Sequence, residues 1–200
     1  MVQSISNREG SGNILISLDV ETTGPCPAVA DLVSLGAVAL REDTLGECGR
    51  IKLRVREPDG GWQWDEDTRR WWAEQDPEVY RDNFMAGPRL SRGETAERLE
   101  QWLKDLGGTP VFAAHPACFD WQWINDLFWC GLGRNPFGYR ALCIRSLGYG
   151  VQGAVDWGKD RADDPEFYVA PERPHDPLSD AVAQAEQLRR IITHVRSKAA

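Results

Sequence analysis

The sequence predicts a single α/β domain, in which helices cover a sheet. Three strand-like runs come first, at Ile14 to Val20, Leu32 to Leu40 and Arg50 to Arg56, and helical patterns follow them with one further strand. The 200 residues have the length of one ordinary domain, with 42% hydrophobic and 27% charged residues and no internal repeat. We therefore expect one domain at residues 13–197, after a flexible polar leader at residues 1–12.

The early strands differ in their patterns. Ile14 to Val20 is a compact apolar run that ends at a Thr-Thr-Gly-Pro turn, which is typical of a buried strand. Leu32 to Leu40 continues in strand-like composition. Arg50 to Arg56 alternates basic and apolar residues, which predicts one basic face. That face either follows a phosphate backbone or, as we favour, protects a solvated edge strand by its charge.

Helix-start signals mark the middle of the chain. Asp65 to Gln75 begins with a capping residue, and Pro77 begins a second short helix capped by Asp76. The run from Ser91 to Leu106 opens with capping-box spacing and ends at a Gly-Gly pair, which predicts a third helix.

The second half of the chain continues the mixed pattern. Pro110 to Ala114 is a short apolar strand, and the Trp-rich stretch Phe119 to Cys130 has the length of a helix. Gly148 to Pro174 is rich in Gly, Asp and Pro and predicts a long surface loop. Pro177 to Arg196 carries an apolar stripe at helical spacing and predicts the final helix.

Composition excludes several classes of protein. The formal charge of −8 disfavours a domain that binds nucleic acid mainly by counterion release, but it allows a nuclease whose metal ions supply positive charge. The apolar runs fall short of the roughly 20 residues that span a bilayer, and no secretory signal is present, so we expect a cytoplasmic protein with no membrane contact. Five cysteines without a CxxC pair predict reduced thiols.

Two acidic residues end the first strand. Asp19 and Glu21 are two residues apart, so their side chains point to the same face. Neighbouring carboxylates at the end of a buried strand repel each other and lose hydration, a cost that a divalent cation offsets. Oxygen ligands favour Mg²⁺ or Mn²⁺. The alternative is that both acids merely meet solvent at the end of a strand. A metal site is favoured only if further ligands or catalytic groups occur later in the chain, and Asp120, His175 and Asp180 are candidates.

The ordered set of Asp19-x-Glu21, Asp120 and His175-x4-Asp180 resembles the DEDDh group of 3'-5' exonucleases in the ribonuclease H-like superfamily. The resemblance covers nearly the whole chain and implies a ribonuclease H-like mixed β-sheet flanked by α-helices. The stretch Asp65 to Gln75 further resembles a phage and bacterial exoribonuclease-like branch. One departure is the absence of the Asn that many relatives place shortly before the Phe-Asp pair.

The resemblance implies the chemistry. Asp19, Glu21, Asp120 and Asp180 would hold two divalent ions, Mg²⁺ or Mn²⁺, about 3.5 to 4 Å apart at the scissile phosphate. Hydrolysis would release nucleoside 5'-monophosphates. We assign His175 as the general base, because an imidazole can accept a proton from the attacking water near neutral pH. The alternative is a surface histidine without a task.

The resemblance and the residue types also suggest substrate contacts. Aromatic faces stack on unpaired bases with about 1 to 3 kcal/mol each. Among the nine tryptophans, Trp62, Trp64, Trp71 and Trp72 could line a single-strand groove, with Trp72 as the first candidate, although most are expected in the core. Turn formation is the alternative for the residues after Glu21. The expected contacts are Thr22, Thr23, Gly24, Trp72, His115 and Phe119.

We therefore expect a metal-dependent 3'-5' exonuclease acting on the 3' ends of single-stranded RNA or DNA, with a slight lean to RNA from the branch resemblance. One alternative is a proofreading or repair component that depends on a partner protein. Another is a nonenzymatic nucleic-acid-binding module, which would have lost a metal ligand. A homodimer stays open.

Overall fold

A computed structural model describes residues 12–153 and 167–199. Its sheet has the strand order β3-β2-β1-β4-β5, in which the β1–β2 and β2–β3 pairs are antiparallel and the β1–β4 and β4–β5 pairs are parallel. The leader predicted at residues 1–12 lies, apart from Gly12, outside the described residues. The strands are β1 (Asn13–Thr22), β2 (Leu32–Arg41), β3 (Glu47–Arg54), β4 (Thr109–Ala114) and β5 (Ala141–Cys143).

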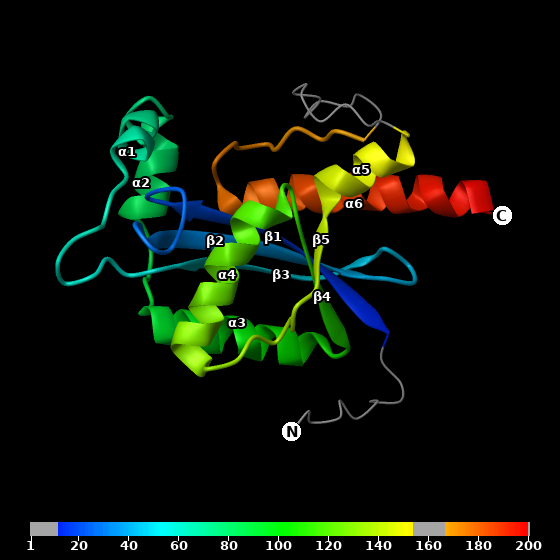
Figure 1. The fold of residues 1–200 in the computed structure, drawn as a ribbon, viewed down its shortest axis with the longest axis horizontal. Helices are drawn as coiled ribbons and strands as arrows, with labels where there is room; N and C mark the ends of the chain where they lie inside the picture. The colour runs from blue at the N-terminus through cyan, green and yellow to red at the C-terminus, as the bar shows by residue number, and fades with distance from the viewer. Residues whose placement is uncertain (1–11, 154–166, 200) are drawn as a thin grey trace.

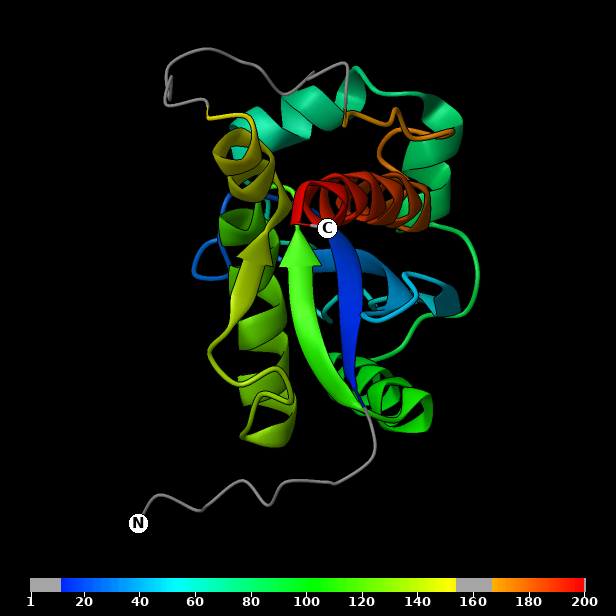
Figure 2. The same cartoon turned by 90° about the vertical axis from the view of Figure 1, so that its right-hand side faces the viewer.

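Helices cover both faces of this sheet. The helices are α1 (Glu66–Ala73), α2 (Pro77–Phe84), α3 (Arg92–Leu106), α4 (Ala117–Leu132), α5 (Ile144–Val151) and α6 (Pro177–Ala199). In Figure 1, α5 and α6 lie above the sheet and α3 lies below it, while α1 and α2 form a pair at one end. Figure 2 looks along α6 and shows α1 and α2 beyond its start.

Strand β1 sorts its side chains between these two layers. Ile14, Ile16 and Leu18 are buried against α3 and α4, whereas Leu15 is buried in a second cluster with α6. Because successive side chains of a strand point to opposite faces, Asp19 follows Leu15 onto the α6 side. The carboxylates of β1 therefore face the helix that carries Asp180.

Gly36 lets α6 come close to the sheet. It lies opposite Asp19 in the β1–β2 register. A Cβ atom there would stand 2.3 Å from backbone atoms of Pro177 and Leu178, so no side chain fits. The absence of a side chain thus allows the start of α6 to rest directly on β2.

Most expected elements are confirmed, including the caps of α1 and α2 by Asp65 and Asp76 and the capping box of α3. The predicted loop from Gly148 to Pro174 is wrong at its start, where α5 extends to Val151, and residues 154–166 lie outside the described residues. The short strand β5 escaped prediction. Among the described residues, all five cysteines are free, as expected, and no helix is long and apolar enough to cross a membrane.

The predicted basic face of β3 is paired with acids. Lys52 Nζ lies 2.6 Å from Asp82 Oδ2 and 2.7 Å from Asp176 Oδ2, and Arg54 Nη2 lies 2.7 Å from Asp82 Oδ1. Arg50 pairs with Glu47. The face therefore bridges β3 to α2 and to the start of α6, which leaves Lys52 and Arg54 little charge for a phosphate backbone.

We expect Gly36→Ala to lower the free energy of unfolding by about 1 to 3 kcal/mol, because the new methyl group must displace α6. Gly93→Ala is the control, since a Cβ atom at Gly93 meets nothing within 4 Å. Urea denaturation of both variants measures the difference. Equal stability of the two variants would contradict the close contact at Gly36.

Candidate active site

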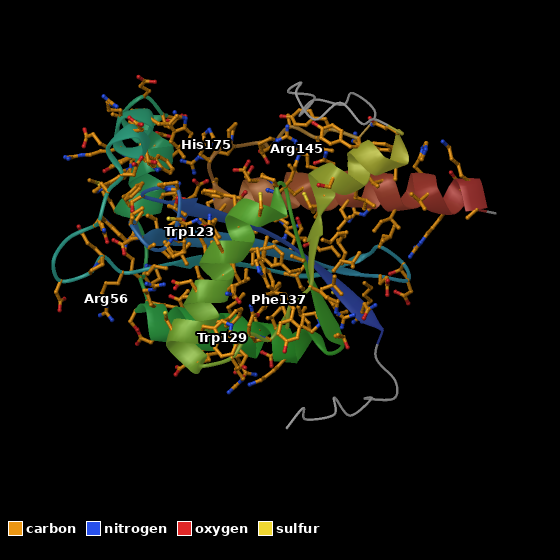
Figure 3. All side chains as sticks on the ribbon, viewed as in Figure 1. Arg56, Trp123, Trp129, Phe137, Arg145 and His175 are labelled. Carbon is orange, nitrogen blue, oxygen red and sulfur yellow. The ribbon has the colours of Figure 1, made fainter. Side chains whose placement is uncertain are left out.

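A cleft of about 670 Å³ opens where the end of β1 meets the first turns of α4 and α6. Figure 3 shows His175 between the α1–α2 pair and the start of α6, above the sheet, whereas Trp129 lies below the sheet. The expected residues that line the cleft are Asp19, Glu21, Thr22, Gly24, Trp72, His115, Phe119, Asp120, His175 and Asp180.

Three carboxylates converge in this cleft. One oxygen from each of Asp19, Glu21 and Asp180 lies within 4.8 Å of the others. Asp120 stands beside this group, and its Oδ1 accepts a hydrogen bond from the Val20 backbone N–H at 3.1 Å. The sequence prediction that these four acids gather at one place is therefore consistent with the structure.

The carboxylates are held in an environment that disfavours their charged forms. Burial raises the pKa of Asp19 and of Glu21 well above ordinary values, and repulsion from neighbouring carboxylates adds to it. Burial also raises the pKa of Asp120 to about 7 and that of Asp180 to about 6. Raised carboxyl pKa values of this kind are typical of functional sites in which neighbouring acids lack a neutralising cation.

The donor set fits a divalent cation. Asp180 Oδ2 is buried and has no hydrogen-bond partner within the described residues. The charge of Lys52 offsets a small part of the rise in the pKa of Glu21. The Lys52 ammonium is, however, already paired with Asp82 and Asp176. Hard oxygen ligands with excess negative charge are what Mg²⁺ and Mn²⁺ prefer.

His175 enters the cleft from the segment before α6. Its backbone has φ 63°, a left-handed conformation, and its carbonyl oxygen accepts a hydrogen bond from Asn83 Nδ2 at 2.7 Å. The imidazole meets the Trp71 ring edge-on, with centroids 4.7 Å apart. Burial lowers the pKa of His175, so the ring is neutral near neutral pH and can accept a proton.

Thr23 does not reach the cleft. It is fully buried, its hydroxyl donates to the Gln63 carbonyl at 2.5 Å, and the Asp31 N–H donates to it at 2.8 Å. The expected substrate contact at Thr23 is therefore corrected to its alternative, a turn. Thr22 lines the cleft, but its hydroxyl donates to the Gly24 carbonyl at 2.8 Å.

Trp72 also departs from expectation. Its side chain is 1% exposed, packs against Val33, Val79 and Phe84, and donates from Nε1 to the Thr22 carbonyl at 2.9 Å. A covered ring has no face for a base. The preceding residue, Trp71, is 39% exposed and lines the cleft.

Gln184 is a residue of the site that the sequence analysis missed. Its Nε2 donates to Asp19 Oδ1 at 2.8 Å, and its Oε1 accepts the His115 backbone N–H at 3.0 Å. The amide therefore fixes the Asp19 carboxylate against the start of α4. Its position one helical turn after Asp180 was the available signal, because residues four apart share a helix face.

His115 lies at the wall of the cleft. Burial and the charge of Arg145 lower its pKa, and its side chain hydrogen-bonds Gln187. Arg145 lies on α5, above the sheet in Figure 3. The imidazole therefore has a hydrogen-bond partner on α6, and substrate contact by His115 stays a prediction.

Comparisons with known proteins give a consistent result. A family model described as the 3'-5' exoribonuclease Rv2179c-like domain matches residues 15–192. The chain is 32% identical over 198 residues to Cap18 of Escherichia coli, named a 3'-5' DNA exonuclease, and the match covers 89% of this chain and 91% of Cap18.

Solved structures of Escherichia coli exonuclease I share the fold. A zinc-bound complex with single-stranded DNA gives a TM-score of 0.66 at 11% identity and covers 92% of this chain and 41% of that chain. A complex with a dT13 oligonucleotide gives a TM-score of 0.67 at 11% identity, with 93% and 42% covered. The chain thus spans about two fifths of their length. This likeness confirms the expected ribonuclease H-like fold.

We expect divalent ions to stabilise the protein more at about pH 8 than at about pH 5. A carboxyl group whose pKa is raised by folding binds its proton more tightly in the folded state, so the stability of the metal-free protein falls as pH rises from about 4 to about 7. Mg²⁺ or Mn²⁺ binds the deprotonated carboxylates and opposes this loss.

Melting temperatures with chelator, Mg²⁺ and Mn²⁺ at both pH values test this expectation. The Asp19→Asn/Asp180→Asn double variant is the control, because it removes two of the three converging carboxylates. If the ions stabilise the double variant as much as the unmodified protein, the ions bind elsewhere.

Proposed function

We propose a metal-dependent mechanism for this chain. The chain belongs to the family of Rv2179c-like 3'-5' exoribonuclease domains. It is a DEDDh-type 3'-5' exonuclease and therefore a hydrolase. This membership sets aside the alternative of a nonenzymatic binding module. The family match at residues 15–192 supports the proposal that residues 13–197 form the exonuclease domain.

The observation that carries the mechanism is the convergence of Asp19, Glu21 and Asp180 within 4.8 Å. These carboxylates and Asp120 would hold two divalent ions, Mg²⁺ or Mn²⁺. When bound, such ions supply activation of water and neutralisation of the charge that develops at the phosphate. Gln184 orients the Asp19 carboxylate, and the Val20 N–H orients that of Asp120.

His175 acts as the general base in this proposal. The imidazole lines the same cleft as the carboxylates and is neutral near neutral pH, since burial lowers its pKa. It takes a proton from the water that attacks the last phosphodiester bond. The leaving group is the 3'-oxygen of the shortened strand, and the product is a nucleoside 5'-monophosphate.

The terminal nucleotide would be held by groups around the carboxylates. Trp71 and Phe119 line the cleft and offer aromatic surface to a base, with Trp71 39% exposed. Gly24 lines the cleft where the chain turns after β1. A Cβ atom at Gly24 would lie 2.6 Å from Ala30 Cβ, so the turn requires a glycine there.

We propose single-stranded DNA as the first substrate to test and RNA as the second. The DNA proposal rests on Cap18, which matches over 91% of its length and is named a DNA exonuclease. The RNA candidate rests on the family description and on the lean from the sequence. Contacts with the 2'-hydroxyl decide between them, and no described group identifies such a contact.

We expect the unmodified protein to shorten 5'-labelled single-stranded oligonucleotides stepwise from the 3' end with Mg²⁺ or Mn²⁺. Asp19→Asn should reduce the rate by about 100-fold or more, because a lost ligand removes several kcal/mol of charge stabilisation. Matched DNA and RNA strands with a chelator arm rank the substrates. Glu97→Gln, an exposed acid on α3, is the control, and equal loss in both variants would contradict the assignment.

We expect His175→Asn to lower kcat by about 10²- to 10⁴-fold with little change in KM, because the base is lost while binding surfaces remain. Asn tolerates the left-handed backbone at this position. His194→Asn is the control, since His194 packs on Phe167 with ring centroids 5.3 Å apart, outside the cleft. An unchanged kcat in His175→Asn would sink the assignment of the base.

A further inference from the structure

We propose that Asn83 is a positioning residue of the exonuclease reaction, which holds His175 in place through the peptide carbonyl of that histidine. The inference rests on the proposed function, in which His175 is the general base. Asn83 lies on α2, is fully buried, and belongs to none of the residues expected from the sequence.

The amide of Asn83 is fixed at both ends. Its Nδ2 donates to the His175 carbonyl at 2.7 Å, and its Oδ1 accepts from the Ser34 hydroxyl at 2.8 Å. Because a carbonyl oxygen only accepts hydrogen bonds, the NH₂ end must face His175 and the oxygen must face Ser34. Ser34 lies on β2 and is also fully buried. A rigid bridge thus runs from the sheet through α2 to the backbone of His175.

His175 needs such a bridge for two reasons. Its φ of 63° lies in the left-handed region, which residues other than glycine occupy rarely without support. Among the described residues, its imidazole has ring contacts with Trp71 and Trp72 but no hydrogen bond. A catalytic histidine is commonly oriented by a hydrogen bond to its second nitrogen. Within the described part of the chain, the backbone and the two tryptophan rings are therefore the groups that orient this imidazole.

Helix α2 also holds Asp176, the residue after His175, through the ion pairs of Lys52. Lys52 Nζ contacts Asp82 of α2 at 2.6 Å and Asp176 at 2.7 Å, so the ion pair draws the segment toward α2. Asp176 in turn accepts the N–H groups of Leu178 and Ser179 at the start of α6. Two neighbouring residues of α2 therefore secure two neighbouring residues of the segment that delivers His175.

A double-mutant cycle tests the proposal. We expect Asn83→Leu to lower kcat about 10- to 100-fold with KM nearly unchanged, because small displacements of a catalytic group carry costs of this size. In a His175→Asn background the same change should alter the residual kcat less than about twofold, since the group it positions is gone. Residual rates are measured with enzyme in excess over a labelled oligonucleotide, and melting temperatures are recorded for every variant.

Two further variants guard the result. Ser34→Ala keeps the Asn83 N–H donor to His175 but removes the hydrogen bond to the amide oxygen of Asn83. It should therefore cause a smaller loss of kcat, which should also disappear in the His175→Asn background. This variant replaces Asn83→Leu in the cycle if Asn83→Leu fails to fold. Thr95→Val removes another buried hydrogen bond, at the start of α3, and should lower the melting temperature without changing kcat.

The outcomes separate two failures. If the unmodified protein is inactive, the proposed function fails. If His175→Asn keeps full activity, the exonuclease stands, but the assignment of His175 as the base fails and the inference about Asn83 is overturned with it. If His175→Asn is impaired while Asn83→Leu keeps full kcat, or costs the same factor in both backgrounds, the proposed function stands. In that case Asn83 is only a structural residue, and the inference is overturned.

Discussion

Mutual repulsion among closely spaced carboxylates at the end of β1 is the constraint on which the rest of the structure depends. Folding gathers Asp19, Glu21 and Asp180 within 4.8 Å and partly buries them, so other interactions must supply the free energy to hold them there. The apolar layers on both faces of the sheet provide it, and the even and odd residues of β1 serve different layers.

Helix α6 and Gly36 together bring the carboxylates close to one another. Helix α6 carries Asp180, which completes the carboxylate group, and Gln184, which holds Asp19 from a position 165 residues away in the chain. Both side chains reach β1 only because Gly36 has none, which lets the backbone of α6 approach β2. The convergence of the carboxylates and the packing of α6 on the sheet therefore depend on the same contact at Gly36.

Local patterns predicted what depends on local physics. The parity of β1 placed Asp19 and Glu21 on one face, and cap residues fixed the starts of α1, α2 and α3. The sequence did not show which of Trp71 and Trp72 is exposed, because the burial of adjacent helical residues depends on the elements that pack against the helix. Lys52 looked free because its acidic partners lie 30 and 124 residues away. Asn83 gave no signal, because its partners are a strand hydroxyl and a backbone carbonyl.

The position of α6 in the chain has a consequence for biosynthesis. Protein domains emerge from the ribosome with their N-terminal parts first. Strand β1 ends at Thr22, whereas α6 begins at Pro177, so the nascent chain exposes Asp19 and Glu21 long before Asp180 and Gln184 exist. The carboxylate group closes only when this helix docks on Gly36. A ribosome-bound or truncated chain without α6 would therefore lack the wall of the cleft that Asp180 and Gln184 form.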